Sequence, residues 1–474
     1  MTTSNGSRGV PHVVILGGGP AGVGAAYYLR RTGKATVTLL EQHSAFGGNA
    51  GSLRWGDQYV DYGSHRLHEA VDPKILADMK TLMGDDLAYR ERHGRIRLRG
   101  KWLHFPLKPI DLFLRLDRAF GFGAARDMVR GMFTGRPDEG DTFASVLKAN
   151  LGPTICEHFY FPYARKMWGR EPGELSGIQA RKRVSAGSFA KLVKRILGSR
   201  GSYFYYPREG YGQISTSYAK AAAELGADLR VGSLVTRLSL PGGDDGRWVV
   251  EYESGGEKHS AEADYVWSTI PITIVARMVD PPPKPSVLEA ANAIEYRAMV
   301  LVYVELGVNQ FTTTDAHYFP ERHISFTRLS EPKNYFGLSE PAGRTTLCAE
   351  LPCDRGDELW NSSDEELKAL VVADIRKAEL PLEGEPLSVH VRRLPQAYPI
   401  YLKGYEIPLE KLEEWTEALP GFLSFGRQGL FAHDNTHHAL FMAYSAVDCI
   451  EGLDFSAEKW AQYCEIFKTH VVED

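Results

Sequence analysis

The stretch of sequence that decides the fold reads His12-Val-Val-Ile-Leu-Gly17-Gly18-Gly19-Pro20-Ala21-Gly22-Val-Gly24-Ala-Ala-Tyr-Tyr-Leu29. A short apolar run, typical of a buried strand, meets the spacing Gly17-x-Gly19-x-x-Gly22, and a helical pattern follows directly. In that context Gly17 permits a tight turn, Gly19 lets the backbone approach a pyrophosphate, and Gly22 lets the helix pack against the strand. The helix that begins at Pro20 and Ala21 would direct N–H groups and its positive dipole at phosphates. The stretch predicts a dinucleotide site; the alternative is a glycine-rich turn in an ordinary βαβ unit.

A second apolar run supports this interpretation. Residues 36–40 predict a strand that ends at Glu41, nineteen residues after Gly22. A carboxylate at this position accepts hydrogen bonds from the ribose hydroxyls of a bound dinucleotide. Strand, helix and acidic residue therefore all stand where a dinucleotide-binding unit requires them.

Length and composition indicate a globular protein of more than one domain. The chain has 474 residues, of which 43% are hydrophobic and 24% charged, and single cores rarely grow beyond roughly 250–300 residues. A net charge of −5 argues against a nucleic-acid-binding protein, because no basic excess is available to neutralise phosphates. The five cysteines show no paired spacing and no nearby histidine cluster, so we predict no metal site and a reducing compartment.

The distribution of apolar residues bears on location. No signal peptide is readable in the polar N-terminal residues, and no run approaches the ~18 apolar residues that a membrane span needs. We therefore expect a cytoplasmic protein without a transmembrane segment. Residues 112–132 form an apolar helical stripe with interleaved arginines, which would also suit docking on a membrane surface. We favour a helix that packs inside a substrate domain.

Two motifs that follow Glu41 resemble a known family. Gly47-Gly48 after the ribose carboxylate is similar to the second signature of FAD enzymes of the amine oxidase and protoporphyrinogen oxidase superfamily. Most of these enzymes have Arg after the glycine pair, whereas this chain has Asn49. Gly-Gly-Asn-Ala followed by Tyr-Gly-x-His65-x-x-His68 looks most like the UDP-galactopyranose mutase branch. The resemblance implies that FAD is the cofactor and that His65 lies beside the isoalloxazine; the alternative for either histidine is a buried structural role.

Later segments add to the cofactor site that the resemblance implies. In relatives the residue at Val235 supplies backbone hydrogen bonds to the adenine. A strand like the one before Gly426-Arg427 ends beside the pyrophosphate and ribityl chain, and the helix after Asn435 and Thr436 points its N-terminus at the flavin. Mutases usually have Asp where this chain has Thr436, which weakens a direct claim of mutase activity.

The substrate side rests on two further motifs. In the mutase branch, arginines in the position of Arg181 and Arg183 hold a nucleotide-sugar pyrophosphate, which guanidinium forks suit; the alternative is a solvated basic turn. The segment Ala397-Tyr398-Pro-Ile-Tyr401 strongly resembles the family and implies that both tyrosines lie between substrate and flavin. A structural tyrosine at a sheet edge is the alternative.

The resemblance covers nearly the whole chain and implies its architecture. We expect an α/β fold with a doubly wound, Rossmann-like FAD-binding domain formed by residues 10–104, 203–284 and 402–474. An α+β substrate domain would be inserted, with a helical part at 105–202 and an antiparallel sheet at 285–401. No second fingerprint exists in the sequence, so we expect no separate NAD(P)H domain.

The leading functional hypothesis is an FAD-dependent oxidoreductase, either an oxidase or a dehydrogenase. A hydride would pass from a small-molecule substrate to flavin N5, and oxygen or an electron carrier would reoxidise the flavin. His65, Tyr398 and Tyr401 are the expected orienting or proton-transfer groups. The alternative is a redox-neutral nucleotide-sugar mutase that uses reduced flavin, with Arg181 or Arg183 on the diphosphate. A flavin-stabilised binding or sensor protein is the third, non-enzymatic possibility, and the sequence does not identify a substrate.

Overall fold

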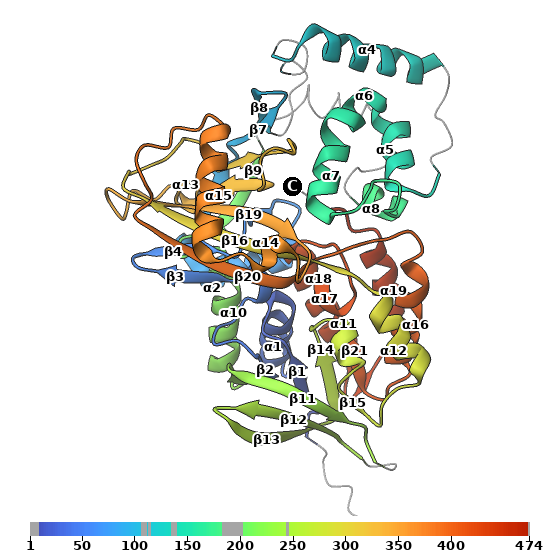
Figure 1. The fold of residues 1–474 in the computed structure, drawn as a ribbon. Helices are drawn as coiled ribbons and strands as arrows, with labels where there is room; N and C mark the ends of the chain where they lie inside the picture. The colour runs from blue at the N-terminus through green and yellow to red at the C-terminus, as the bar shows by residue number, and fades with distance from the viewer. Residues whose placement is uncertain are drawn as a thin grey trace, which may run out of the picture.

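A parallel sheet of five strands joins the N-terminal, middle and C-terminal parts of the chain (Figure 1). Its strand order is β10-β2-β1-β14-β21. The computed structural model describes residues 9–105, 111, 115–133, 140–182, 202–242 and 246–472. The strands are β1 (His12–Leu16), β2 (Thr36–Leu40), β10 (Asp228–Arg230), β14 (Tyr265–Ser268) and β21 (Phe422–Ser424). The register pairs Leu16 with Leu40 and with Ser268, so the carboxyl ends of the strands meet at one edge, where nucleotides bind in such sheets.

The two faces of this sheet are covered differently. Side chains at alternating positions of β1 divide between them: Val13 and Ile15 face helices, whereas Val14 and Leu16 face a second sheet. The helices are α1 (Pro20–Thr32), α10 (Gln213–Glu224) and α18 (Thr436–Asp448). The second sheet contains β11 (Ser233–Ser239), β12 (Trp248–Ser254), β13 (Glu257–Ala263) and β15 (Val279–Asp280). A doubly wound sheet carries helices on both faces; here the described residues place a mostly antiparallel sheet on one of them.

A seven-stranded sheet forms the floor of the other half, in the order β20-β16-β19-β18-β17-β7-β8. Its members are β7 (Gly94–Leu98), β8 (Lys101–Phe105), β16 (Tyr296–Leu306), β17 (Ala316–Tyr318), β18 (Arg328–Ser330), β19 (Thr345–Cys353) and β20 (Ser388–Pro399). One face packs on α15 (Asp364–Lys377) through Val300 and Val302. The opposite face carries Leu301 and Tyr303 toward β4 (Gln58–Asp61).

The hairpin of β7 and β8 belongs to the seven-stranded sheet. The hairpin about Gly100 forms as predicted from the sequence. Its strand β7 pairs in parallel with β17, whereas the sequence motifs group residues up to 104 with the FAD-binding domain. The pairing joins Ala316 to Gly94, and local sequence patterns carry no signal for a contact over such a distance along the chain.

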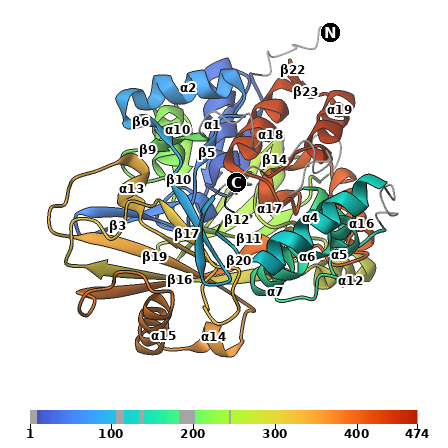
Figure 2. The same cartoon turned by 90° about the horizontal axis from the view of Figure 1, so that it is seen from above.

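The segment expected to be helical, residues 105–202, consists mainly of helices in its described part. Seen from above, this segment and the seven-stranded sheet lie on one side of the molecule, and α1, α2 (Pro73–Met83) and α10 lie on the other (Figure 2). In the described residues no helix is long and apolar enough to cross a membrane. Only part of the apolar helical stripe at 112–132 lies among the described residues. The segment contains α4 (Arg118–Phe133), α5 (Phe143–Leu151), α6 (Pro153–Ile155), η3 (Cys156–Tyr160), α7 (Phe161–Trp168) and α8 (Gly177–Arg181).

Shorter elements connect these layers. Small sheets have the orders β5-β9-β6, β3-β4 and β22-β23. Their strands are β3 (Ser52–Trp55), β5 (Leu67–His68), β6 (Leu87–Glu91), β9 (Tyr203–Pro207), β22 (Ile450–Glu451) and β23 (Asp454–Phe455). The remaining helices are η1 (Gly48–Ala50), α2 (Pro73–Met83), η2 (Gly84–Asp86), α11 (Ile272–Val275), α12 (Pro285–Ala293), α13 (Pro332–Phe336), α14 (Glu358–Asn361), α16 (Glu406–Glu417), α17 (Gly426–Gly429) and α19 (Ala457–Lys468).

Candidate functional site

A cavity of about 360 Å³ lies at the carboxyl edge of the parallel sheet and continues to the seven-stranded sheet. We call it the central cavity. Its lining starts at Gly17 and ends at Val472, so segments from the whole length of the chain contribute to it. Twelve of the sequence-predicted site residues line it: Gly17, Gly19, Pro20, Ala21, Glu41, Gly48, Asn49, His65, Tyr398, Arg427, Asn435 and Thr436.

The turn between β1 and α1 (residues 17–22, the fingerprint turn) depends on glycine at two positions for different reasons. A Cβ atom added to Gly22 would lie 1.9 Å from the carbonyl oxygen of Gly17, so only glycine lets α1 start this close to β1. A Cβ added to Gly19 would meet only the Cα of Gly48, at 3.9 Å. Gly22 is therefore needed for the turn itself, whereas Gly19 keeps the cavity beside the turn open.

Glu41 is buried at the end of β2 and lines the central cavity. Its Oε2 accepts the N–H of Gly18 at 2.7 Å, and its Oε1 accepts the N–H of His43 at 2.8 Å. Each carboxylate oxygen has a second lone pair, so the side chain can also accept hydrogen bonds from a ligand in the cavity. The two backbone bonds fix its orientation beside the fingerprint turn.

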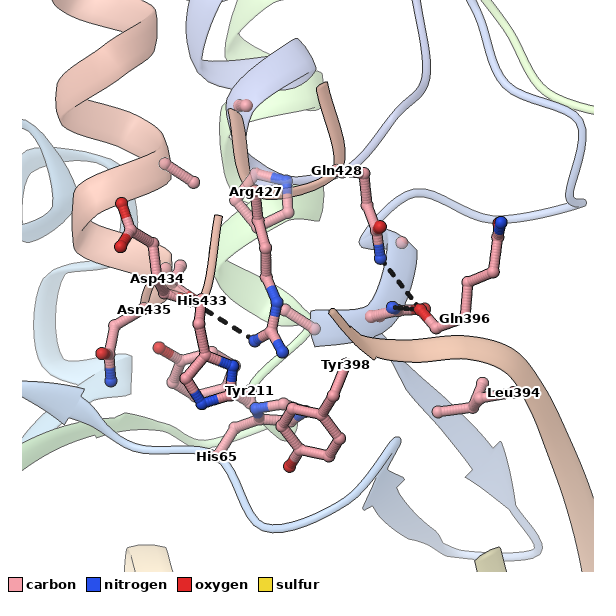
Figure 3. A pocket seen from close by; sticks show the side chains of 18 of the residues that line it. His65, Tyr211, Leu394, Gln396, Tyr398, Arg427, Gln428, His433, Asp434 and Asn435 are labelled. Carbon is pink, nitrogen blue, oxygen red and sulfur yellow. Dashed lines mark hydrogen bonds between the residues drawn. The ribbon is translucent and has the colours of Figure 1, made fainter. Parts of the chain in front are cut away.

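Three separate segments meet at the main chain of Gln396 in β20. The side-chain amides of Asn49 and Gln428 donate to the Gln396 carbonyl at 2.8 and 2.9 Å. Figure 3 shows the Gln428 side chain directed at Gln396. Gly47, at φ +126°, donates its N–H to the carbonyl of Gly18 at 2.8 Å. The glycine pair after Glu41 thus holds the fingerprint turn, while Asn49 holds the floor sheet.

Arg427 extends from the start of α17 toward the rings of Tyr398 and His433 (Figure 3). Its guanidinium donates to the carbonyls of Ala397 and Asp434 at 3.0 and 3.3 Å and lies 5.0 Å from the Tyr398 ring centroid. These contacts fix a positive charge at the cavity wall. Gly426 before it is buried against Ala21, where an added Cβ would come within 2.8 Å of the alanine methyl group.

His65 is held as a neutral imidazole. Its ring stacks on Tyr211 with a centroid distance of 5.3 Å, and its Nε2 lies 3.0 Å from the carbonyl oxygen of Tyr62. Because a carbonyl only accepts, Nε2 carries the hydrogen and Nδ1 is an acceptor. Burial lowers the pKa of His65 to about 4. At neutral pH the residue can therefore accept a hydrogen bond at Nδ1 but has no proton to give from this atom, and burial disfavours its protonation.

Tyr398 belongs to a polar group that the sequence did not reveal. Its hydroxyl accepts from Nη2 of Arg328 at 3.1 Å. Arg328 is buried, and both its Nε and Nη2 donate to Oε2 of Glu350, at 3.0 and 2.7 Å. The other oxygen of Glu350 accepts the N–H of Ser64 at 2.6 Å. One buried carboxylate therefore positions both the arginine behind Tyr398 and the loop that carries His65.

Three other predicted site residues lie away from the lining, and a fourth is not described. Val235 is buried within β11 and packs in the core below the parallel sheet. Arg181, at the end of α8, is exposed and does not line the cavity. Arg183 lies outside the described residues. Tyr401 is buried beside Tyr405, where its hydroxyl donates to the carbonyl of Phe431 and accepts the N–H of His433.

The position of Tyr401 leads to a first prediction. Tyr401→Phe should lower the free energy of unfolding by about 1–3 kcal/mol, because it leaves two buried backbone groups without a partner. Tyr398→Phe should change it by less than about 1 kcal/mol. Urea unfolding of the two purified variants compares them directly. If Tyr401→Phe is as stable as the parent protein but loses substrate turnover, a catalytic role for Tyr401 is restored.

Acidic and basic side chains from distant segments meet at the rim of the central cavity. Asp434 is buried, and its two oxygens lie 2.9 Å from Nδ1 of His470 and 3.5 Å from Nζ of Lys182. The rings of His438 and His470 stack at 4.1 Å and 12°. Potential ligand atoms of Asp434, His438 and His470 lie within 4.8 Å of one another, but the lone pairs of parallel rings do not converge on one point. The group is an ion-paired junction, and Val472 next to it donates its N–H to the carbonyl of Lys182.

His437 gives a second prediction, on pH. It is buried, and within the described chain neither ring nitrogen has a hydrogen-bond partner. Burial lowers its pKa to about 4. Below about pH 6.5 the histidine is therefore protonated in the unfolded chain but stays neutral in the folded protein. This difference lowers the free energy of unfolding as the pH falls from about 6.5 to about 4. His437→Phe should lose this dependence, so its stability advantage should grow by up to about 1.4 kcal/mol per pH unit. Unfolding at pH 7.5, 6 and 5 tests this; an unchanged difference between the two proteins would contradict it.

Comparison with known families identifies the chain. Residues 20–439 match the family of flavin containing amine oxidoreductases. The chain belongs to this family. The match begins within the fingerprint turn and ends in α18, so it includes the seven-stranded sheet, four of the five strands of the parallel sheet and most residues that line the central cavity.

Individual relatives of this flavin family are distant in sequence. Protoporphyrinogen oxidase 2 of Arabidopsis thaliana is 21% identical over 468 residues, which cover 87% of this chain and 89% of the relative. Coproporphyrinogen III oxidase of Bacillus subtilis is 22% identical over 451 residues, which cover 89% and 94%. Among solved structures, a reduced UDP-galactopyranose mutase superposes with a TM-score of 0.81 at 20% identity, covering 98% of this chain and all of that chain. That likeness shows a shared fold.

FAD is the cofactor of this amine oxidoreductase family member, and the residues present fit it. The N-terminus of α1 has no side-chain cap among the described residues, so its first N–H groups are left for a ligand. Gly19 leaves open space in front of them, and the buried carboxylate of Glu41 stands at the adjoining strand end. These are the features that a pyrophosphate and a ribose require.

Proposed function

We propose that this protein is an FAD-dependent oxidoreductase that takes a hydride from a small-molecule substrate bound between His65, Tyr398 and Arg328. The observation that carries the proposal is the continuity of the central cavity, which joins the fingerprint turn to these three side chains. A substrate seated there would lie at the far end from the nucleotide turn, where the family places the reactive ring. The curated relatives named above are oxidases, which favours net oxidation.

We assign the cofactor residues from the same geometry. The fingerprint turn with Gly17, Gly19, Pro20, Ala21 and Gly22 would face the pyrophosphate, and Glu41 the ribose. Gly47 and Gly48 would shape the loop over the cofactor, and Val235 would remain a backbone contact for the adenine. The side chains toward the flavin ring would be Asn49, His65, Arg427, Asn435 and Thr436.

The same proposal divides the chain into two units. We infer a Rossmann-like FAD-binding unit at 10–93, 203–284 and 402–474, and a substrate-binding unit at 105–202 and 285–401. The hairpin at 94–105 goes with the substrate-binding unit because β7 pairs with β17.

The side chains around the cavity would orient the substrate through hydrogen bonds. When bound, FAD supplies a ring that accepts a hydride at N5. Arg328 donates to the hydroxyl oxygen of Tyr398, so the phenolic hydrogen is directed to another acceptor, and a substrate oxygen or nitrogen can be that acceptor. Neutral His65 can accept a hydrogen bond at Nδ1 and so orient an O–H or N–H group of the substrate. The rings of Tyr211, Tyr398 and His433 around this point limit the access of water.

The redox-neutral mutase is the alternative that has to be distinguished. It would require a diphosphate site at Arg181 or Arg183, and Arg181 lies outside the lining of the central cavity. Thr436 stands where mutases usually have Asp. The geometry therefore favours the oxidoreductase.

An anaerobic experiment separates the two activities. The purified yellow protein is mixed, without oxygen, with coproporphyrinogen III, protoporphyrinogen or putrescine. These molecules appear in the names of related oxidases. The visible absorbance of the flavin is followed in each mixture. We expect one of them, or another reduced small molecule, to bleach the flavin, and air to restore it with formation of peroxide. Conversion of UDP-galactopyranose by chemically reduced protein, with no substrate that bleaches the flavin, would overturn the proposal in favour of the mutase. Protein that stays colourless after FAD is supplied would exclude both.

A further inference from the structure

Two arginines line the central cavity but have no role in the proposed chemistry. Both donate hydrogen bonds to the same buried tyrosine. Arg66 follows His65 in the chain, and Arg92 follows β6. Nη1 of Arg66 and Nη2 of Arg92 both donate to the hydroxyl oxygen of Tyr318, at 3.2 and 3.0 Å. The two guanidinium groups thus share one hydroxyl oxygen as an acceptor.

Arg66 has little countercharge in direct contact. In the part of the chain that the structure describes, Arg66 forms no ion pair with a carboxylate, and its buried Nε has no hydrogen-bond partner. The carboxyl of Asp315, buried nearby, accepts the N–H of His93 at 2.7 Å and acts on Arg66 only through space. Arg328, by contrast, forms an ion pair with Glu350 at 2.7 Å. The guanidinium of Arg66 can therefore still form an ion pair with a ligand anion.

Aromatic rings hold the two guanidinium groups in place. Arg66 lies over the rings of Tyr335 and Phe204, at 4.9 and 5.6 Å from their centroids. Arg92 lies over the ring of Phe105 at 4.7 Å. Such contacts fix the planar groups and exclude water, which strengthens their attraction for an anion. The two guanidinium groups are therefore held in position before a ligand binds.

The arginine pair adjoins the place where we seat the substrate. Directly opposed residues in a sheet project from the same face. Tyr318 is opposed by Arg328 in β18, and Arg328 by Glu350 in β19. Arg328 in turn contacts the hydroxyl of Tyr398. An anionic group bound to Arg66 and Arg92 and a reactive carbon beside Tyr398 can therefore belong to one molecule.

We propose that Arg66 and Arg92, which share the hydroxyl of Tyr318, form a subsite for an anionic group of the substrate, either a carboxylate or a phosphate. This inference deepens the proposed function and rests on it for the placement of the substrate. The guanidinium groups donate charge-assisted hydrogen bonds to the anion. The substrate class is then an organic acid or a phosphate ester.

Binding of simple anions to the FAD-loaded protein tests the subsite without a known substrate. Calorimetry and the flavin difference spectrum are recorded with sodium succinate, inorganic pyrophosphate and uncharged succinamide. We expect one of the two anions to bind, more weakly as KCl is raised, and succinamide not to bind. The anion that binds distinguishes a carboxylate from a phosphate. If neither anion binds, or if succinamide binds equally well, the proposal is wrong.

Variants assign the binding to these residues. Arg66→Gln and Arg92→Gln should each weaken binding about 10- to 100-fold, and Arg66→Lys should restore part of it. Arg376→Gln is the matched control, because this arginine is exposed on α15 and pairs with Glu385. Equal FAD content in all four proteins excludes misfolding. Unchanged anion affinity in Arg66→Gln and Arg92→Gln would overturn the subsite. If anions bind through Arg66 but no substrate reduces the flavin, the proposed oxidoreductase fails and the subsite stands.

Discussion

Gly22→Ala is expected to abolish FAD binding and to lower the free energy of unfolding by about 3 kcal/mol or more. The added methyl carbon would lie 1.9 Å from the carbonyl oxygen and 3.1 Å from the carbonyl carbon of Gly17. Both are backbone atoms of the fingerprint turn, so the overlap can be relieved only if α1 moves away from β1. That movement would displace the N–H groups that are directed at the pyrophosphate. Urea unfolding and the FAD content of the purified variant measure the two effects.

Gly19→Ala is the matched control for this prediction. Its added Cβ meets only the Cα of Gly48 at 3.9 Å, and its φ of −73° suits alanine. Folding without FAD should therefore change by less than about 0.5 kcal/mol, while FAD binding should weaken because the methyl group fills space in front of α1. If Gly22→Ala binds FAD normally, or Gly19→Ala destabilises the protein as strongly as Gly22→Ala, the roles assigned to the two glycines are wrong.

Glu350→Ala is expected to destabilise the protein by about 3–5 kcal/mol. Glu350 is 1% exposed and is the ion-pair partner of the buried Arg328. Its removal leaves a buried guanidinium charge uncompensated and frees the N–H of Ser64. The loop with His65 and the hydroxyl of Tyr398 then lose their common support, so flavin reduction by substrate should slow as well. Denaturant unfolding and anaerobic flavin reduction give the two readouts.

Two comparisons sharpen this test. Glu385→Ala removes an exposed partner, that of Arg376, and should cost less than about 1 kcal/mol. The double variant Glu350→Leu with Arg328→Met removes both buried charges and should recover most of the stability, but not the reaction. A loss of less than 1 kcal/mol in Glu350→Ala would show that the pair is not the support we describe.

The nucleotide end of the site could be predicted from the sequence because its signals are local. Gly17, Gly19 and Gly22 lie within one turn, and Glu41 follows the next strand directly. Each places its chemistry relative to a strand end that the apolar pattern already marks. The motif around Tyr398 was recognisable through the family, and the structure brings Tyr398 to the cavity.

The substrate end could not be predicted in the same way because its contacts are long-range. Arg328 and Glu350 meet across two strands, and neither stands in a recognisable motif. Tyr401 shares the motif of Tyr398, but the chain leaves β20 at Pro399, and Tyr401 then packs on Tyr405 instead of lining the cavity. Arg66 and Arg92 are ordinary basic residues until the fold places Tyr318 between them.

The order of strands in the parallel sheet has a consequence for synthesis of the protein. The ribosome completes β1 and β2 by residue 40, but their neighbour β14 follows only at Tyr265–Ser268 and the edge strand β21 at Phe422–Ser424. The cavity lining is complete only at Val472. Contacts of such high sequence separation form late. The growing chain must therefore carry an unpaired edge of β1 until β14 has been made, and the cavity that receives the cofactor is completed only by the segment near Val472.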